Sequence, residues 1–265
     1  MRLALIQPDI VSGDPRANID HMQELIARAV QDKPDIIVLP EMWNTSYALK
    51  SVADLADRYG EPAAKTIGGL AGRYGVNIVA GSVADLRGGK VYNTSYIFNR
   101  RGEVAASYSK VHLFGLMEEG NYLAAGDSRV TFELDGVRCG IIICYDLRFP
   151  ELSRLLALDG AVIMFVPAQW PKPRQHPWHT LMLARAIENQ MFVAGVNRVG
   201  REGKAEFFGH SLLVNPLGEI ILQGSEQKEE ILSTEIDLDQ VKKVREYMTC
   251  FNDRVPAVYK EILNK

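Results

Sequence analysis

The chain has 265 residues, of which 47% are hydrophobic and 24% are charged, a composition typical of a globular protein. The formal net charge of −3 argues against a nucleic-acid-binding protein, because such proteins carry clustered Lys and Arg to neutralise phosphates. Three cysteines and the lack of a long apolar run argue against a disulfide framework and a membrane span, so we expect a cytoplasmic protein.

The first half of the sequence predicts alternating strands and helices. Asp14 and Pro15 are a typical N-cap and first-turn residue for an amphipathic helix that continues to about residue 30. Apolar runs and hairpin signals predict the remaining elements of this half: strands at 3–6, 35–39, 77–83, 91–98 and 104–108, and a helix over 55–74.

The second half follows a similar alternation, without a low-complexity linker between the halves. We therefore expect one α/β domain over residues 1–265, built of layered sheets and helices. The pattern predicts strands at 130–134, 138–143, 161–166, 192–197, 211–214, 219–222 and 230–236, and helices at 150–158 and 176–190.

Three reactive side chains come just after the carboxyl ends of predicted strands: Glu41, Lys110 and Cys144. Ligands of α/β proteins usually bind at this edge, because the loops there converge on a rigid sheet. Each residue taken alone has an ordinary structural explanation. A cysteine at a strand end is usually a small buried hydrophobe, as we expect for Cys139, and a loop glutamate or lysine is usually solvated.

The sequences around these residues are more specific. Residues 40–47 (PEMWNTSY), 108–114 (YSKVHLF) and 143–151 (ICYDLRFPE) together resemble the nitrilase superfamily of carbon–nitrogen hydrolases. The resemblance extends over nearly the whole chain, through Glu119, residues 123–127 (LAAGD), 185–189 (RAIEN) and 209–218.

This resemblance implies a catalytic set of Glu41, Lys110 and Cys144, with Glu119 as an additional glutamate that holds the lysine. It implies a four-layer αββα sandwich that forms a homodimer through its helices. It implies no cofactor. Cys144 is then the nucleophile, Glu41 the proton carrier, and Lys110 with the backbone N–H of Tyr145 the stabiliser of the oxyanion. Lys110 is also expected to raise the thiolate fraction of Cys144.

Histidine is the usual partner of a catalytic cysteine, so a Cys-His hydrolase is the nearest mechanistic rival. The predicted positions of His21, His176 and His179 on helices favour capping or surface roles. His176 and His179 could also be read as metal ligands, but no third ligand stands at a recognisable spacing, so we expect no metal site. Gly68 and Gly69 are expected in a turn or in helix packing rather than in a phosphate-binding loop.

The substrate is expected to be a small amide that carries a distal carboxylate. The segments around Arg148 and at 168–171 (AQWP) are most similar to the branch of ω-amidases, which release ammonia from 2-oxoglutaramate or 2-oxosuccinamate. Arg148 could bind the carboxylate or pair with Asp146 or Glu151. Further candidates for the pocket wall are Tyr47, Gln169 and Trp170.

Two alternatives remain open at this stage. N-carbamoyl amino acid hydrolases and other small-amide amidases of this family use the same three side chains, and the N-carbamoyl amino acid hydrolases also bind a carboxylate through arginine. The second alternative is a binding or regulatory subunit that has lost catalysis, although intact Glu41, Lys110 and Cys144 argue against it.

Overall fold

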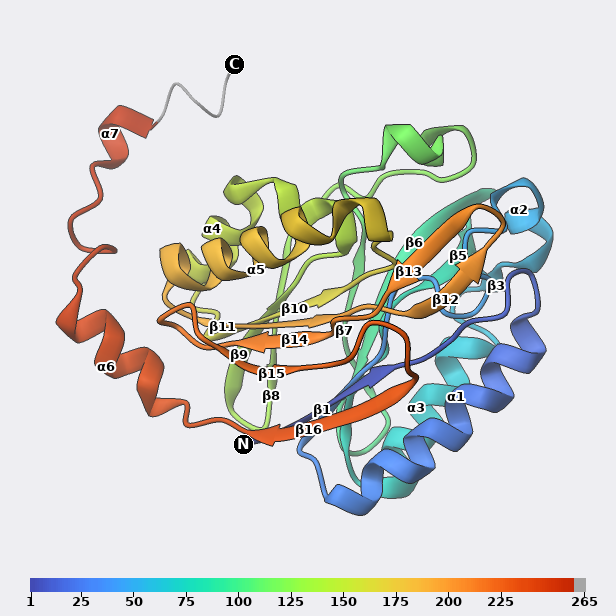
Figure 1. Ribbon diagram of the computed structural model, residues 1–265, viewed down its shortest axis with the longest axis horizontal. Coiled ribbons are helices and arrows are strands. Elements are labelled where there is room, and N and C mark those ends of the chain that lie inside the picture. Colours follow the sequence, from blue (N-terminus) through green and yellow to red (C-terminus); the bar gives the residue numbers. More distant parts are fainter. Residues whose placement is uncertain (260–265) are drawn as a thin grey trace.

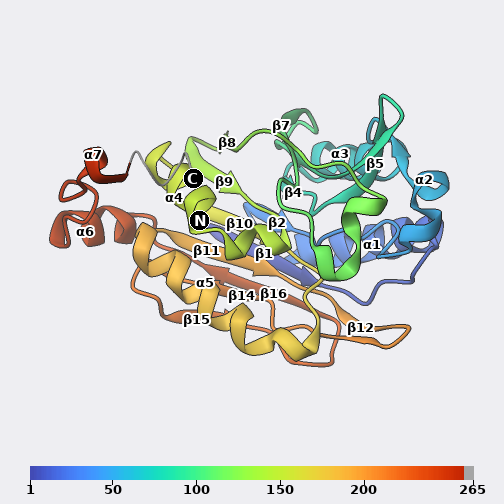
Figure 2. The ribbon, with the colours of Figure 1, turned by 90° about the horizontal axis from the view of Figure 1, so that it is seen from above.

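The computed structural model describes residues 1–259. It has the αββα architecture that the resemblance implied: two sheets pack face to face, and helices cover the outer face of each (Figure 1, Figure 2). Within these residues no helix combines the length and the apolar character needed to cross a bilayer.

The first sheet has eight strands in the order β16-β1-β2-β4-β6-β5-β3, with β7 also paired to β6. β1, β2 and β4 run parallel, whereas β16, β6 and β5 join by antiparallel pairing. Its strands are β1 (Arg2–Gln7), β2 (Ile36–Val38), β3 (Asp57–Arg58), β4 (Asn77–Val79), β5 (Val83–Arg87), β6 (Lys90–Phe98), β7 (Val104–Ser109) and β16 (Glu230–Glu235).

The second sheet has six strands in the order β15-β14-β11-β10-β9-β8, and a separate hairpin pairs β12 with β13. β9, β10 and β11 are parallel, so their carboxyl ends meet at one edge. These strands are β8 (Val130–Leu134), β9 (Val137–Ile141), β10 (Ile163–Pro167), β11 (Phe192–Val196), β12 (Val199–Glu202), β13 (Ala205–Phe208), β14 (Leu212–Val214) and β15 (Ile220–Gln223).

The helices α1 and α3 cover the first sheet, and α4 and α5 cover the second (Figure 1). The α6–α7 segment extends away from the body as the C-terminal arm. The helices are α1 (Pro15–Ala29), α2 (Val52–Leu55), α3 (Ala63–Tyr74), α4 (Pro150–Leu158), α5 (Gln175–Asn189), α6 (Asp239–Tyr247) and α7 (Pro256–Tyr259).

The buried side chains of β1 alternate between the two faces of its sheet. Leu3 and Leu5 join the core between the sheets, whereas Ala4 and Ile6 join the core under α1 and α3. This alternation follows from the two-residue repeat of a strand, and it explains why strands buried on both faces are continuously apolar in sequence. The same burial holds the strand ends rigid where the reactive residues follow.

Most predicted elements are confirmed to within a few residues, including the capped helix α1. Asp14 accepts a hydrogen bond from the backbone of Ala17 at 3.0 Å, as an N-cap should. The predicted helix over 55–74 is wrong in its first part, because residues 57–58 form β3 and the helix begins only at Ala63. Pro62 immediately precedes Ala63 and is a poor interior helix residue.

The single strand predicted over 77–83 is also wrong, since the structure divides it into β4 and β5. Gly81 lies between them with φ of +58°, and a Cβ there would come 1.9 Å from the carbonyl oxygen of Pro40. Only glycine fits this approach. Ser82 then donates its N–H to Pro40 at 3.0 Å, so the break supports the segment that carries Glu41.

The hairpin β12–β13 and the helices of the C-terminal arm were not predicted from the sequence. Each hairpin strand has only four residues, and the polar, exposed or partly exposed Arg201, Glu202 and Glu206 interrupt the buried apolar ones, so the hydrophobic repeat that indicates a strand is weak there. The hairpin nevertheless contributes Glu202 to the surroundings of the site described next.

Candidate active site

The structure brings together the three side chains that the strand ends predicted. Glu41 follows β2, Lys110 follows β7 directly, and Cys144 comes three residues after β9. The Glu41 and Lys110 side chains are completely buried, and only 8% of Cys144 is exposed. Charged groups are buried this deeply only when they are paired, so their partners define the site.

Lys110 lies between two carboxylates. Its Nζ donates to Oε1 of Glu41 at 2.9 Å and to Oε1 of Glu119 at 2.8 Å. Glu119 is held in turn by the hydroxyl of Tyr47 at 2.9 Å and by the backbone N–H of Phe114, also at 2.9 Å. The ammonium group is therefore fixed in position as well as in charge.

Glu41 is held from three directions. The side-chain amide of Asn93 donates to Oε1 at 2.8 Å, and the backbone N–H of Gln169 donates to Oε2 at 2.8 Å. The side-chain amide of Gln169 also donates to the backbone carbonyl of Glu41 at 2.8 Å. Gln169, predicted as part of the pocket wall, thus lines the pocket and also positions the glutamate.

Cys144 occupies a strained backbone position at the start of a 3₁₀ turn, Cys144–Arg148. Its φ is +47°, in the left-handed region that a side chain makes costly, by about 1–3 kcal/mol. The turn is secured by Asp146, which accepts the N–H of Ile143 at 2.9 Å. Such residues often occur where a reactive group has to be presented in one orientation.

Asp146 also ties the cysteine turn to the lysine segment. Its buried carboxylate accepts the hydroxyl of Tyr108 at 2.6 Å and the backbone N–H of His112 at 2.9 Å, and the His112 ring lies 2.8 Å away. Because Tyr108 and His112 flank Lys110 in sequence, one carboxylate fixes the nucleophile relative to the ammonium. Sequence reasoning did not identify this role.

The surroundings raise the pKa values of Cys144, Lys110 and Glu119. Burial raises the pKa of the Cys144 thiol well above its ordinary value, and the Glu41 carboxylate adds to this, while Lys110 opposes it. Lys110 thus lowers the thiol pKa, as expected, but burial and the Glu41 carboxylate outweigh it, so the net pKa of the thiol is raised. For Lys110, burial works against the charged form, but Glu41 and Glu119 overcome it and raise the pKa.

The pKa of Glu119 is also raised, by burial first, although Lys110 pulls it down. A cysteine that rests as the thiol has to lose its proton as it attacks. A carboxylate next to the thiol is suited to take that proton. This arrangement favours attack assisted by a base over attack by a preformed thiolate.

A second layer of polar side chains supports the Glu41 loop. Arg198 is completely buried and donates to Ser46 Oγ at 2.8 Å and to Asp9 at 2.7 Å. Ser46 Oγ lies 3.0 Å from Gln169 Oε1 and also hydrogen-bonds Glu202 of β12. Neither Arg198 nor Glu202 was predicted. The available sequence signal for Arg198 was an arginine directly after the strand predicted at 192–197.

A narrow pocket leads to Cys144. It has about 20 Å³ of free space and is lined by Tyr47, Phe114, Met117, Cys144, Tyr145, Arg148, Gln169, Trp170, Pro171 and Arg174. The predicted wall residues Tyr47, Arg148, Gln169 and Trp170 thus all line it. Within residues 1–259, Arg148 has no carboxylate within 4.0 Å, so the predicted alternative of a pair with Asp146 or Glu151 is wrong.

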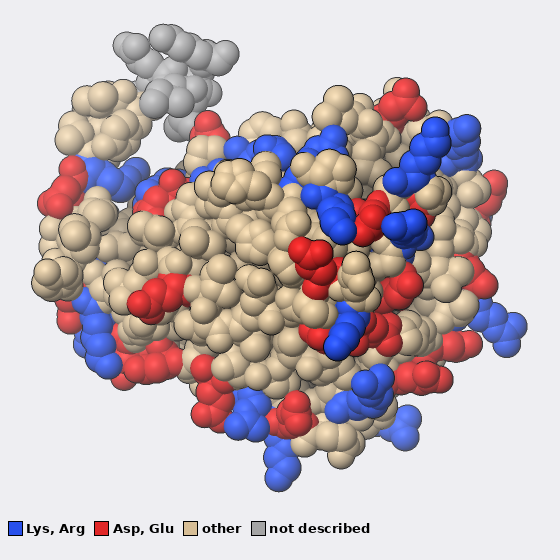
Figure 3. Space-filling view, in the orientation of Figure 1, with Lys and Arg blue, Asp and Glu red and all other residues tan. Residues whose placement is uncertain are grey.

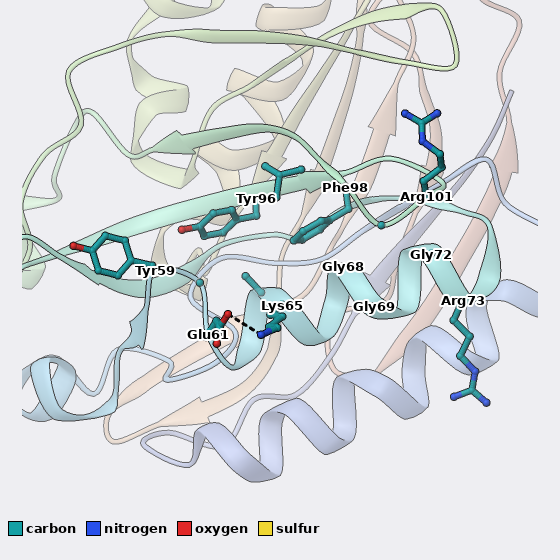
Figure 4. Close-up of a pocket in the computed structure, with 14 residues that line it drawn as sticks. Tyr59, Glu61, Lys65, Gly68, Gly69, Gly72, Arg73, Tyr96, Phe98 and Arg101 are labelled. Atoms are coloured by element: carbon teal, nitrogen blue, oxygen red, sulfur yellow. Dashed lines mark hydrogen bonds and ion pairs between the residues drawn. The ribbon is translucent and has the colours of Figure 1, made fainter.

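A larger groove of about 570 Å³ lies elsewhere, between α3 and β6 (Figure 4). Tyr96 and Phe98 lie over the helix, and no cysteine, serine or histidine is among the described residues that line it. A Cβ on Gly68 would come 2.7 Å from the Phe98 ring, which confirms helix packing for this glycine. Because the described lining of this groove contains no thiol and no histidine, the narrow pocket at Cys144 is the candidate active site.

The other cysteines and the histidines lie outside the pocket lining. Cys139 is fully buried in the core, as predicted, and Cys250 is exposed on the C-terminal arm. His179 contacts His210 at 3.1 Å and the backbone carbonyl of Gln175 at 3.0 Å. Within residues 1–259, no group of three potential ligands comes close enough together to hold a metal ion.

The fold and the cluster around Cys144 define a class of enzyme. The sequence pattern of the carbon–nitrogen hydrolase family matches residues 2–246, and the chain belongs to this family. The protein is therefore a carbon–nitrogen hydrolase of the nitrilase superfamily.

Three similar proteins illustrate the relationship. A 2-oxoglutaramate amidase of Bacillus subtilis is 43% identical over 95% of this chain and 96% of its own length. A human omega-amidase is 31% identical over 97% of this chain and 96% of its own length. Among solved structures, a CN-hydrolase superfamily protein from Xanthomonas campestris, with an arsenic adduct in its active site, has 30% identity and a TM-score of 0.90 over 96% of this chain and 97% of that one.

Proposed function

We propose that the protein is an ω-amidase that hydrolyses 2-oxoglutaramate or 2-oxosuccinamate to the 2-oxo acid and ammonia. The observation that carries the chemistry is Lys110 held between Glu41 and Glu119 beside the pocket that contains Cys144. The similarity to a 2-oxoglutaramate amidase and an omega-amidase supports the choice of substrate.

The first half of the reaction forms a thioester. Glu41 takes the thiol proton while Cys144 sulfur bonds to the amide carbon, and the carbonyl electron pair moves to oxygen. Lys110 Nζ and the backbone N–H of Tyr145 stabilise this oxyanion; loss of one such donor costs about 2.7–4 kcal/mol of barrier. When the intermediate collapses, Glu41 returns the proton to the leaving nitrogen, and ammonia departs.

The second half releases the acid. Glu41 takes a proton from water as the water oxygen bonds to the thioester carbon, and collapse of the new intermediate expels the sulfur. The sulfur recovers a proton from Glu41, which restores the starting state. Glu119 contacts Lys110 and serves to position it. Its hydrogen bonds to Tyr47 and Phe114 support that role.

Arg148 is the proposed partner of the substrate carboxylate. It lines the pocket, lies over the face of Trp170 at 5.1 Å, and has no acidic partner within the described part of the chain. A guanidinium group that is free of a protein carboxylate can form a two-pronged pair with a substrate carboxylate. Trp170 and Tyr47 then form walls beside the acyl chain.

An ammonia-release panel tests this function. We expect 2-oxoglutaramate or 2-oxosuccinamate to have a higher kcat/KM than glutamine, an N-carbamoyl amino acid or a simple nitrile. The Cys144→Ser variant should bind the substrate but release little ammonia. Preference for the N-carbamoyl compound would refute the proposed substrate and leave the catalytic proposal in place.

The functional unit is proposed to be a homodimer. Exposed apolar side chains lie on α4, α5, the β14–β15 turn and β15: Leu158, Ile187, Leu217, Ile220 and Ile221. Figure 3 shows a largely uncharged area over this side of the molecule. A second copy would remove the apolar surface from water. Light scattering should give a mass twice that of the chain, and Ile187→Asp should lower the measured mass toward that of the monomer. A monomeric wild type would refute the dimer.

We further propose that the enzyme works in the cytoplasm, because a reducing compartment keeps cysteine thiols free. All three cysteines are free in the structure. Fractionation of cells that produce the protein would test this, and recovery from an oxidising compartment would contradict it.

A further inference from the structure

Two arginines line the pocket that leads to Cys144, although the sequence pointed only to Arg148. The second is Arg174, which precedes α5 and is half-buried. Within residues 1–259, neither guanidinium group has a carboxylate within 4.0 Å, and each lies instead over an aromatic ring. Arginines on a protein surface commonly find acidic neighbours, as Arg100, Arg129 and Arg201 do here.

Trp170 connects the two arginines. Arg148 lies over the Trp170 ring, and the indole Nε1 of Trp170 donates to the backbone carbonyl of Arg174 at 2.8 Å. The guanidinium group of Arg174 lies 5.1 Å from the centre of the Phe114 ring, which is also part of the pocket wall. Trp170 therefore fixes the backbone of one arginine and supports the side chain of the other.

The charged side chains that line this pocket are positive. Among the described residues, those that line it include Arg148 and Arg174 but neither Asp nor Glu. The acidic groups of the site, Glu41 and Glu119, are completely buried and already bound to Lys110. Substrate at the pocket mouth thus meets two cations and no anion, an arrangement that attracts an anionic group and repels an ammonium group.

We propose that Arg174 is a specificity-determining residue that, together with Arg148, clamps the 2-oxo carboxylate end of the substrate. This inference rests on the proposed ω-amidase function and adds a second cation to it. A 2-oxo acid presents three acceptor oxygens at that end, two of the carboxylate and one of the ketone. Two guanidinium groups can donate to all of them.

The same clamp distinguishes 2-oxoglutaramate from glutamine, which has the same chain length and amide. Glutamine carries an ammonium group in place of the ketone oxygen, so a donor and positive charge would face the two arginines. The mismatch leaves donors unpaired and adds like-charge repulsion. Because the free space is only about 20 Å³, enough for about one water, the long side chains at the mouth have to swing aside as substrate enters.

The kinetic test compares Arg174→Gln with the wild type on three amides: 2-oxoglutaramate, glutamine and pentanamide, which is uncharged. Loss of a charge-assisted contact should lower kcat/KM for 2-oxoglutaramate by about 10- to 100-fold, mainly through KM. The value for pentanamide should change by less than about threefold. Because 2-oxoglutaramate loses most, the preference for 2-oxoglutaramate over glutamine should shrink. Lys172→Gln, a matched loss of charge two residues away, should leave all three values near wild type, since Lys172 pairs with Glu206 and is outside the pocket lining.

Equal losses on 2-oxoglutaramate and pentanamide would mean that Arg174 only supports the fold, and no loss on either would mean that it does not contact substrate. Each result overturns the proposal. Arg174→Lys, which keeps the charge but loses the planar fork, should fall between wild type and Arg174→Gln.

A binding measurement separates this inference from the proposed reaction. The product, 2-oxoglutarate, should protect Cys144 from iodoacetamide, and Arg174→Gln should need at least about tenfold more of it for the same protection. This readout needs no turnover, so it tests the clamp even if 2-oxoglutaramate is not the natural amide. Equal protection of the two proteins, or none in either, would refute the clamp.

Discussion

Replacing Lys110 with methionine tests how the buried charges are balanced. Lys110 is completely buried and bonds Glu41 at 2.9 Å and Glu119 at 2.8 Å. Methionine fills similar space but leaves two buried carboxyl groups without their cation. Loss of one partner from a buried pair costs about 3–5 kcal/mol, so we expect the free energy of unfolding at pH 7 to fall by about that amount.

The pH dependence of this loss has a definite sign. Lys110 lowers the pKa of Glu119, so its removal lets burial raise that pKa further above its ordinary value of 4.5. A carboxyl whose pKa is raised in the folded state contributes stability below its unfolded pKa and loses it as the pH rises through the folded pKa. The deficit of Lys110→Met should therefore widen as the pH rises above the ordinary value of 4.5.

Urea unfolding of four proteins measures these effects: wild type, Lys110→Met, Glu119→Gln and the double variant. Removing the Glu119 charge in the absence of Lys110 should recover part of the loss, about 1–3 kcal/mol, and should flatten the pH dependence. A deficit below about 1 kcal/mol in Lys110→Met, or identical pH profiles with and without Glu119, would refute the reasoning.

Three further predictions follow from local contacts. Asp146→Asn keeps only one acceptor oxygen for the four groups that contact the Asp146 carboxylate. It should therefore lower the free energy of unfolding by about 3 kcal/mol and reduce kcat. An unchanged urea midpoint and an unchanged kcat would contradict this. In Glu41→Gln, the rate at which iodoacetamide alkylates Cys144 should rise about tenfold per pH unit near neutrality, because burial keeps the thiol pKa high. A rate that is independent of pH in this range would indicate a resting thiolate and contradict this. Gly81→Ala forces a Cβ into the Pro40 carbonyl at a positive φ and should cost at least about 2 kcal/mol, whereas wild-type stability would argue against that contact.

The hydrophobic repeat of the sequence predicted most of the core elements, because strands buried on both faces and capped helices leave strong local patterns. α4 was predicted at its observed bounds, and the three reactive residues were correctly placed beyond β2, β7 and β9. The pairing of the two sheets came from the family resemblance and not from periodicity. Strand order depends on contacts between distant residues, which a single sequence does not display.

Contacts that cross the fold were missed for the same reason. Asp146 lies two residues from Cys144, yet its role depends on Tyr108 and His112, which are 38 and 34 positions away. Arg174 precedes α5 and reaches the pocket only through the fold. The net rise of the Cys144 pKa was not predicted, because Lys110 lowers this pKa as expected while the burial that outweighs it cannot be read from the sequence.

The mass of Cys144 during turnover tests the central claim most directly. The enzyme is mixed with 2-oxoglutaramate, quenched in acid within one turnover and digested, and the peptide that contains Cys144 is weighed. The mechanism predicts an added acyl group on Cys144, released with time as free acid and lost in Cys144→Ser. Ammonia release at full rate with no acyl group on this peptide at any time, or with Cys144→Ser still active, would contradict cysteine catalysis in this protein.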